Sequence, residues 1–196
     1  MLFGKEQHPA YFYVYHDLCT VNPYERIMIF IDGSNVFRSI LNYNEKRNDH
    51  FHIDYLKLRD ELCAGRNMIR TYYYGSEAAS RGEGQKGFQE KLRSSGFEVV
   101  IKPLKSYQSP EGREVKIEKG LDIALATDFI SLAWEGAFDT AVIVSGDSDY
   151  MEAVRRVKQK GRKVEIASFR NSLAAEMRTV GDRITILDEI LEKIRL

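Results

Sequence analysis

From Arg26 to the end of the chain, short apolar runs alternate with stretches in which apolar residues recur every three to four positions. Apolar runs rich in β-branched and aromatic residues indicate strands, whereas the longer spacing indicates amphipathic helices. We expect strands at 27–31, 68–74, 97–101, 141–145, 163–167 and 184–187, and helices at 36–41, 54–63, 87–94, 121–134, 150–160, 172–180 and from 188 onward. This alternation predicts an α/β fold with a mostly parallel sheet covered on both faces.

The rest of the chain shows weaker patterns. Residues 1–25 are rich in aromatic side chains but have no clear period, and we interpret them as an N-terminal extension packed on a domain that spans 26–196. Two stretches, 75–87 and 103–120, interrupt the alternation and predict loops, the second with a small hairpin around 109–112. A length of 196 residues favours a single domain.

Aspartates follow two of the most apolar predicted strands. Asp32 comes directly after the first strand, and Asp147 and Asp149 follow the fourth. Open parallel sheets bind ligands beyond the carboxyl ends of their strands, so these side chains are expected at one edge of the sheet. Asp122 lies in the first turn of a predicted helix, whereas Asp128 is six positions further on, a turn of about 240° that need not share its face.

Each aspartate on its own has a simpler interpretation. An aspartate after a strand is often a helix N-cap, and Asp122 could merely complement its helix dipole. If Asp32, Asp122, Asp147 and Asp149 converge, however, protonation or a cation must relieve their repulsion. Oxygen ligands without cysteine or histidine favour Mg²⁺ or Mn²⁺. Such a site indicates hydrolysis of phosphodiester bonds.

Composition at first disfavours a nucleic-acid enzyme. Lys plus Arg and Asp plus Glu both total 29, so the net charge is zero and no global basic field attracts a polyanion. The charges are nevertheless segregated, with six acidic and no basic residues in 120–149 and six basic residues against one acidic in 150–163. A basic helix face is usually just solvated. More suggestive are the basic residues between 81 and 119, among them Arg81, Lys86, Lys116 and Lys119, which could follow a nucleic-acid backbone.

Cysteine content and hydropathy bear on the compartment. Two cysteines are too few for a disulfide framework or a thiolate zinc site, which favours a reducing environment. No apolar run approaches the roughly 18 residues that cross a bilayer, and the N-terminus lacks the pattern of a signal peptide. We therefore expect a cytoplasmic protein with no membrane contact.

Three motifs in order resemble a known family. They are IFIDGSN at 29–35, KGLDIALATD at 119–128 and VIVSGDSDY at 142–150. Together they resemble the NYN domain of the PIN-like nuclease superfamily, in particular its LabA-like branch. The resemblance implies a Rossmann-like three-layer α/β/α sandwich with sheet order 3-2-1-4-5. It also implies a metal-dependent ribonuclease, a hydrolase that uses Mg²⁺ or Mn²⁺ on RNA.

The resemblance also assigns roles by position. Asp32, Asp122 and Asp147 would be the metal-facing carboxylates, and Asp149 and Asp128 would complete or support the cluster. Polar side chains beside them would position a water or a phosphate, namely Ser34, Asn35, Ser145 and Ser148. Many relatives have phenylalanine where this chain has Tyr150, a difference expected to matter little.

Several alternatives stay open. The leading hypothesis is an endoribonuclease acting on single-stranded RNA, and the alternative is a non-catalytic RNA-binding or regulatory adaptor that retains the fold and acts through homo-oligomerisation. Asp147 to Asp149 also match the DxD motif of glycosyltransferases, but that motif is short and common. Ser34 stands where a haloacid-dehalogenase phosphatase would need a second aspartate. His50, His52 and Tyr72 to Tyr74 are more consistent with structural roles.

Overall fold

A computed structural model describes residues 22–77, 83–108, 114–117 and 119–196. The predicted extension at 1–25 therefore lies mostly outside the described residues. Six strands form one parallel sheet in the order β3-β2-β1-β6-β7-β8. Their bounds are Arg26–Asp32 (β1), Asn67–Glu77 (β2), Phe97–Pro103 (β3), Thr140–Val144 (β6), Lys163–Ser168 (β7) and Arg183–Ile186 (β8). The expected order of five strands is confirmed, and a sixth strand extends it beyond β7.

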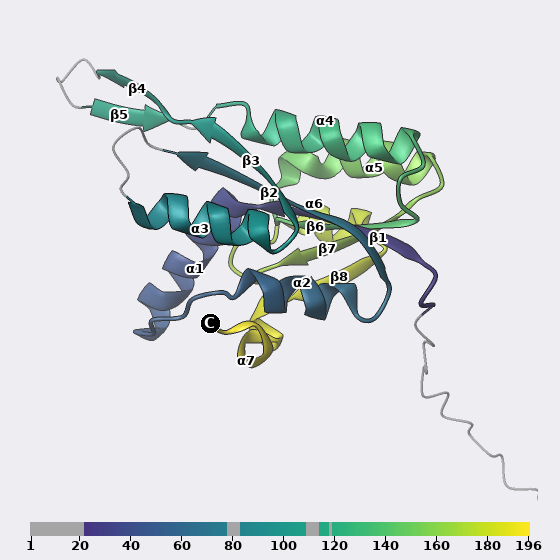
Figure 1. Cartoon of the computed structure of the whole chain (residues 1–196), viewed down its shortest axis with the longest axis horizontal. Helices are drawn as coiled ribbons and strands as arrows, with labels where there is room; N and C mark the ends of the chain where they lie inside the picture. The colour runs from purple at the N-terminus through teal and green to yellow at the C-terminus, as the bar shows by residue number, and fades with distance from the viewer. Residues whose placement is uncertain (1–21, 78–82, 109–113, 118) are drawn as a thin grey trace, which may run out of the picture.

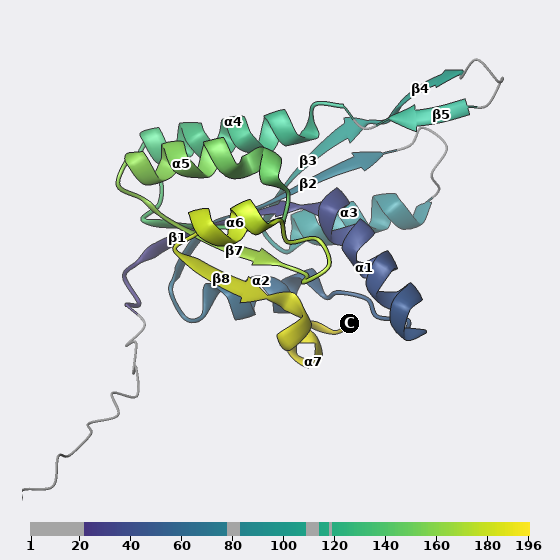
Figure 2. The ribbon, with the colours of Figure 1, turned by 180° about the vertical axis from the view of Figure 1, so that it is seen from behind.

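Helices cover both faces of the sheet (Figures 1 and 2). One face carries α1 (Gly33–Arg47), α2 (Tyr55–Cys63), α3 (Glu83–Ser94) and α7 (Leu191–Ile194), and the other carries α4 (Leu121–Trp134), α5 (Met151–Gln159) and α6 (Ala175–Val180). Short 3₁₀ turns occupy Ser148–Tyr150 (η1) and Leu187–Glu189 (η2). The three-layer α/β/α sandwich is thus confirmed.

The central strand β1 explains why there are two cores. Successive side chains of a strand point to opposite faces, so Ile27, Ile29 and Ile31 pack under α1 and α2, whereas Met28 and Phe30 pack under α4. All five are buried. A strand covered on both faces reads as a continuous apolar run, which is the pattern found at 27–31.

A separate antiparallel pair projects from the carboxyl edge of the sheet (Figure 1). It consists of β4 (Lys105–Gln108) and β5 (Glu114–Ile117), which pair from Lys105 opposite Ile117 to Gln108 opposite Glu114. The hairpin expected in this stretch is confirmed, and its turn at 109–113 lies outside the described residues. Among the described helices, none is long and apolar enough to cross a membrane.

Candidate functional site

Asp32 occupies the end of β1 and the start of α1. Its Oδ1 accepts a hydrogen bond from the backbone N–H of Asn35 at 2.9 Å, so the side chain is the N-cap of α1. Its Oδ2 accepts from the hydroxyls of Ser145 and Tyr150, each at 3.2 Å. The carboxylate is therefore held from three directions, by its own helix and by two residues after β6.

Asp32 is only 2% exposed, and this burial governs its chemistry. Loss of solvation raises the pKa of its carboxyl, the Asn35 N–H lowers it, and the nearby charge of Asp122 raises it again. The net pKa lies above the ordinary value of 3.8. The site thus contains a carboxylate whose negative charge is incompletely compensated by the protein.

The turn after β6 carries Asp147 and is connected to Asp32 through Ser145. Strands β1 and β6 are hydrogen-bonded neighbours, with Ile31 opposite Val144. The backbone N–H of Asp147 donates to Ser145 Oγ at 3.2 Å, and Asp147 Oδ1 caps η1 by accepting from the N–H of Asp149 at 3.0 Å. Ser145 thereby connects the end of β1 with the turn that carries Asp147.

Gly146 makes the connection between β6 and its neighbours tight. Its N–H faces Asn35 Oδ1 at 3.4 Å, and its carbonyl accepts from Ala174 N–H at 2.9 Å. A Cβ at this position would lie 2.1 Å from the carbonyl oxygen of Ser172. A side chain here would push apart the loops that form the sheet edge.

Tyr150 links two aspartates that are far apart in the sequence. Its hydroxyl lies 3.2 Å from Asp32 Oδ2 and 3.1 Å from Asp122 Oδ1. Burial and the two carboxylates raise the pKa of this hydroxyl, so it remains protonated as a donor. The motif alone predicts that the difference from relatives with phenylalanine at this position matters little, but the Tyr150 hydroxyl adds a contact to two aspartates that phenylalanine lacks.

Of the other predicted residues, three lie in the turns that carry Asp147 and Asp32, and one contacts β2 instead. Asp149 and Ser148 are exposed in η1, and Ser34 is half-buried in the first turn of α1. Asp128, in contrast, accepts a hydrogen bond from the Tyr74 hydroxyl at 2.9 Å. Its contact is thus with β2 rather than with Asp32, as the turn of about 240° along α4 allows.

The basic residues lie partly at the same edge of the sheet. Lys86 is exposed in the first turn of α3, and Lys119 is exposed immediately before α4. Lys116 belongs to β5, and Arg81 lies outside the described residues. Two basic side chains of α5 are less available for a nucleic-acid backbone, because Arg156 pairs with Glu152 at 2.8 Å and Lys158 pairs with Asp182 at 2.8 Å.

The donor set suits Mg²⁺ or Mn²⁺ in its chemistry, because it consists of carboxylates and hydroxyls with no sulfur or imidazole. The residues that would face such an ion are Asp32, Asp122 and Asp147, and the charge of Asp122 already disfavours ionisation of Asp32. Within the described ranges, no three His, Cys, Asp or Glu side chains form a ready-made metal-binding group. The structure brings Asp32 and Asp122 together through Tyr150, with Asp147 on the adjacent strand end.

Comparisons with known proteins agree with this architecture. A family model described as "NYN domain" matches residues 26–188. The Low amplitude and bright protein LabA of Synechococcus elongatus is 28% identical over 171 residues, covering 84% of this chain and 85% of LabA. An uncharacterized protein of Methanocaldococcus jannaschii, MJ0482, is 26% identical over 84% of this chain, which spans 56% of that relative. The crystal structure of a Vibrio parahaemolyticus protein of unknown function, VPA0982, matches with a TM-score of 0.68 at 22% identity. The match covers 89% of this chain and 98% of the VPA0982 chain.

Proposed function

The chain belongs to the NYN domain family, a family of PIN-like nucleases, and we propose that it is a metal-dependent ribonuclease acting through Asp32, Asp122, Asp147 and Asp149. One observation carries the proposal. The Tyr150 hydroxyl holds the carboxylates of Asp32 and Asp122 on either side of it, at the carboxyl edge of a parallel sheet where ligands of such folds bind. A helix cap alone would not require the second carboxylate.

The negative charges of Asp32 and Asp122 favour the binding of a cation between them. Two carboxylates that share one hydroxyl repel each other, and Asp32 lacks the water that would otherwise solvate it. Asp32, Asp122 and Asp147 would hold Mg²⁺ or Mn²⁺ with Asp149 in a supporting position, whereas Asp128, which accepts from the Tyr74 hydroxyl, would lie outside the cluster. When bound, a divalent ion supplies charge neutralisation and Lewis-acid polarisation of phosphate oxygens.

The residues of the chain would orient the substrate around this cluster. Ser145 and Tyr150 fix the Asp32 carboxylate, and Asn35 holds the turn at Gly146 against the start of α1. Ser34 and Ser148, close to these carboxylates in the sequence, would position a phosphate or a water molecule. Lys86 and Lys119, both exposed at this edge, would contact the phosphates of single-stranded RNA.

Cleavage of labelled single-stranded RNA tests the proposal. The purified full chain with Mn²⁺ should cut the RNA, and EDTA, Asp147→Asn and Asp122→Asn should each abolish the cutting. Asparagine at 147 can still cap η1, so the loss would reflect charge rather than folding. Asp60→Asn is the matched control, because Asp60 is an exposed aspartate on α2. Cleavage that survives Asp147→Asn would contradict the proposal.

A non-catalytic adaptor is the second candidate, and one observation favours it. The described residues contain no preformed group of three carboxylates that could hold a metal. An adaptor would bind RNA with a salt-dependent affinity and show no turnover with Mg²⁺, Mn²⁺ or other divalent ions. Binding without cleavage under all of these conditions would favour this function over the nuclease.

A further inference from the structure

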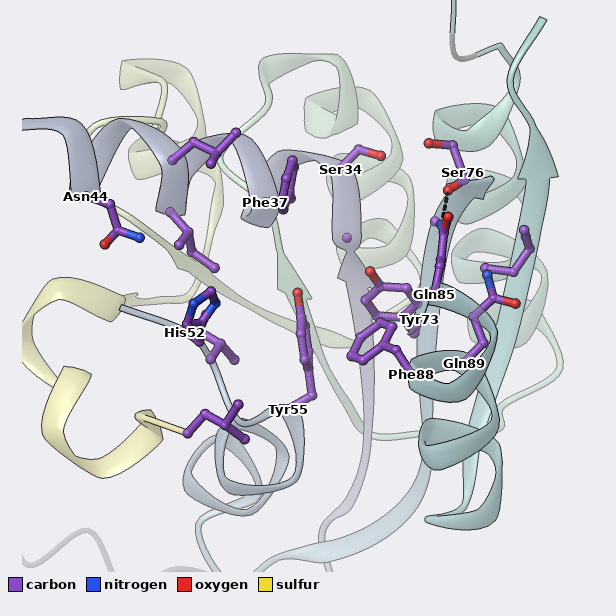
Figure 3. A pocket seen from close by; sticks show the side chains of 17 residues that line it. Ser34, Phe37, Asn44, His52, Tyr55, Tyr73, Ser76, Gln85, Phe88 and Gln89 are labelled. Carbon is purple, nitrogen blue, oxygen red and sulfur yellow. Dashed lines mark hydrogen bonds between the residues drawn. The ribbon is translucent and has the colours of Figure 1, made fainter. Parts of the chain in front are cut away.

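A cavity of about 380 Å³ opens beside the carboxylate cluster, between α1 and α3. Ser34 and Gly33, the two residues after Asp32, line it at one end, and Gln85, Phe88 and Gln89 line it from α3. Figure 3 shows Phe37, Tyr55 and Phe88 around this space, with Ser34 at its rim and Gln85 beside Ser76. The volume lies in the range of small-molecule sites, which are apolar pockets with a few polar groups that fix orientation.

Aromatic side chains form much of the cavity wall. The rings of Tyr55, Tyr73 and Phe88 pack edge to face, with centroids 5.3 to 5.6 Å apart. Phe37 projects from α1 into the same space, and it is 52% exposed despite its size. These three rings pack against one another, and Phe37 offers a face on which a planar ligand could stack.

Two glutamine amides in the wall of the cavity each have an atom without a hydrogen-bond partner among the residues that the structure describes. The Nε2 of Gln85 donates to the carbonyl of Ser76 at 2.8 Å, whereas its buried Oε1 accepts no hydrogen bond. Gln89, one turn further along α3, is only 6% exposed, and its Nε2 donates none. A buried polar atom without a partner is costly, so each one calls for an explanation. Among the described residues, one unpaired acceptor and one unpaired donor thus lie buried in the wall of the cavity, on the same face of α3.

The cavity also adjoins the candidate cleavage site. Gly33 and Ser34, which line the cavity, directly follow Asp32 in the sequence, and burial, the Tyr73 hydroxyl and the charge of Asp32 raise the pKa of the Tyr55 hydroxyl in the same wall. A ligand held between Phe37 and the two amides would have its remaining atoms at the mouth, next to Ser34. Those atoms would lie at the start of α1, next to the Asp32 carboxylate that caps this helix.

We propose that this cavity binds one nucleobase of an RNA strand, with Phe37 stacking on the base and Gln85 and Gln89 reading its edge. Each base presents a hydrogen-bond donor next to an acceptor, which would satisfy both amides, whereas an apolar protein side chain would leave them unpaired. This inference rests on the proposed ribonuclease function and deepens it. The cavity would select the base beside the bond that is cut.

Mononucleotide binding without metal tests the cavity separately from catalysis. The full chain in EDTA is titrated with the 5′-monophosphates of adenosine, guanosine, cytidine and uridine, by calorimetry and saturation-transfer NMR. At least one should bind better than ribose 5-phosphate. Phe37→Ala should weaken the affinity for this mononucleotide by roughly fivefold or more, because a stacking contact is lost. Gln89→Leu should weaken the affinity by roughly fivefold, because a hydrogen bond is lost.

Two matched controls lie on the opposite face of the sheet. Trp134→Ala removes a 50% exposed aromatic residue from α4, and Gln159→Leu removes an exposed amide from α5, and neither should change binding. Phe37 is exposed, so Phe37→Ala is expected to fold even if Gln89→Leu does not. Mononucleotide binding without RNA cleavage would leave this inference standing and contradict only the ribonuclease proposal.

Three results would overturn the inference. The first is that none of the four mononucleotides binds better than ribose 5-phosphate. The second is that binding occurs but is unchanged by both Phe37→Ala and Gln89→Leu, which would place the base elsewhere. The third is that Phe37→Ala changes the oligomeric state and not the affinity for nucleotides, which would make this face an interface between copies of the chain.

Discussion

Asp32 combines a structural contact with an unfavourable burial. Its N-cap hydrogen bond stabilises α1, while the loss of water around its charge destabilises the folded state at neutral pH. Asparagine at this position keeps an acceptor for the Asn35 N–H and removes the charge. We expect Asp32→Asn to raise the free energy of unfolding at pH 7 by about 0.5–2 kcal/mol while abolishing RNA cleavage, as is common for strained functional sites.

The stability difference between Asp32→Asn and the wild type should depend on pH in a predictable direction. Because the folded pKa of Asp32 lies above the unfolded value near 3.8, ionisation favours the unfolded chain. The advantage of Asp32→Asn over the wild type should therefore be absent below pH 3.8, grow as the pH rises through the folded pKa, and then stay constant. Urea unfolding from about pH 3 to about pH 8 measures it. Asp54→Asn, at the N-cap of α2, is the control, and a variant less stable than the wild type at pH 7 would refute the argument.

Two tyrosines allow a matched comparison of aspartate partners. The single hydroxyl proton of Tyr150 lies between Asp32 and Asp122 and can be donated to either carboxylate, and the hydroxyl of Tyr74 donates to Asp128. We expect Tyr150→Phe and Tyr74→Phe each to lower the free energy of unfolding by about 1–3 kcal/mol, because each removes a buried hydrogen bond to a carboxylate. RNA cleavage should fall at least tenfold in Tyr150→Phe and change little in Tyr74→Phe.

Equilibrium unfolding and single-turnover cleavage measure these two effects. Equal loss of cleavage in both variants would mean that Asp128 acts with the cluster after all. Full cleavage in Tyr150→Phe would mean that the bridge is only structural.

At the scale of single residues, sequence predicted positions better than contacts. Asp32 and Asp147 were expected at one edge because each follows an apolar strand, and β1 and β6 do pair side by side. The partner of Asp128 could not be anticipated, because Tyr74 is 54 residues away and belongs to another layer. Nor does the sequence pattern single out Gln85 and Gln89, whose atoms without partners among the described residues appear only in the structure.

The junction between β1 and α1 depends on the absence of a side chain at Gly33. A Cβ there would lie 2.4 Å from the Tyr73 hydroxyl and 2.7 Å from the Tyr74 carbonyl oxygen. We expect Gly33→Ala to lower the free energy of unfolding by roughly 1–3 kcal/mol, because the packed strand cannot move away freely. RNA cleavage should fall as well, since the displaced helix carries the cap of Asp32.

Gly87→Ala is the control for this substitution. Gly87 is an exposed position inside α3, and a Cβ added there would have no neighbouring atom within 4 Å, so alanine should stabilise the helix by about 0.5–1 kcal/mol. Urea unfolding of both variants measures the difference. A Gly33→Ala protein as stable as the wild type would show that α1 can shift without cost.

At the scale of elements, all six strands of the sheet were predicted within a few residues, because buried parallel strands have continuous apolar runs. Helix ends were predicted less well. The helix expected at 36–41 spans Gly33–Arg47, since it starts at the Asp32 cap and continues through polar residues. Asn44 explains the extension, because its side chain exchanges two hydrogen bonds with the backbone of Phe51. The helix expected from 188 onward is a 3₁₀ turn followed by Leu191–Ile194.

For the whole molecule, ion pairs reduce the charge segregation seen along the sequence at one of its acidic residues, Asp139. Arg162 pairs with Asp139 at 3.3 Å, so a residue of the basic segment 150–163 neutralises one of the acidic segment 120–149. Arg26 binds the same carboxylate at 2.7 Å, and its guanidinium lowers the pKa of Asp139. The acidic character therefore remains strongest at the carboxyl edge of the sheet, around Asp122, Asp147 and Asp149.

A neutral molecule with a local basic contact should bind RNA with a shallow salt dependence. Each phosphate neutralised on a single strand contributes about 0.7 to the slope of log affinity against log salt. We expect Lys86→Ala and Lys119→Ala each to reduce the slope by about that amount, because both side chains are exposed at the carboxyl edge where the proposed site lies. Lys163→Ala is the control, since Lys163 begins β7 and lies at the opposite edge.

Fluorescence anisotropy of labelled RNA in EDTA, from about 50 to about 300 mM salt on either side of physiological ionic strength, measures the slopes. An unchanged slope in both edge variants would place the RNA backbone on another surface, whereas a reduced slope together with an unaltered Lys163→Ala would locate it beside Asp122.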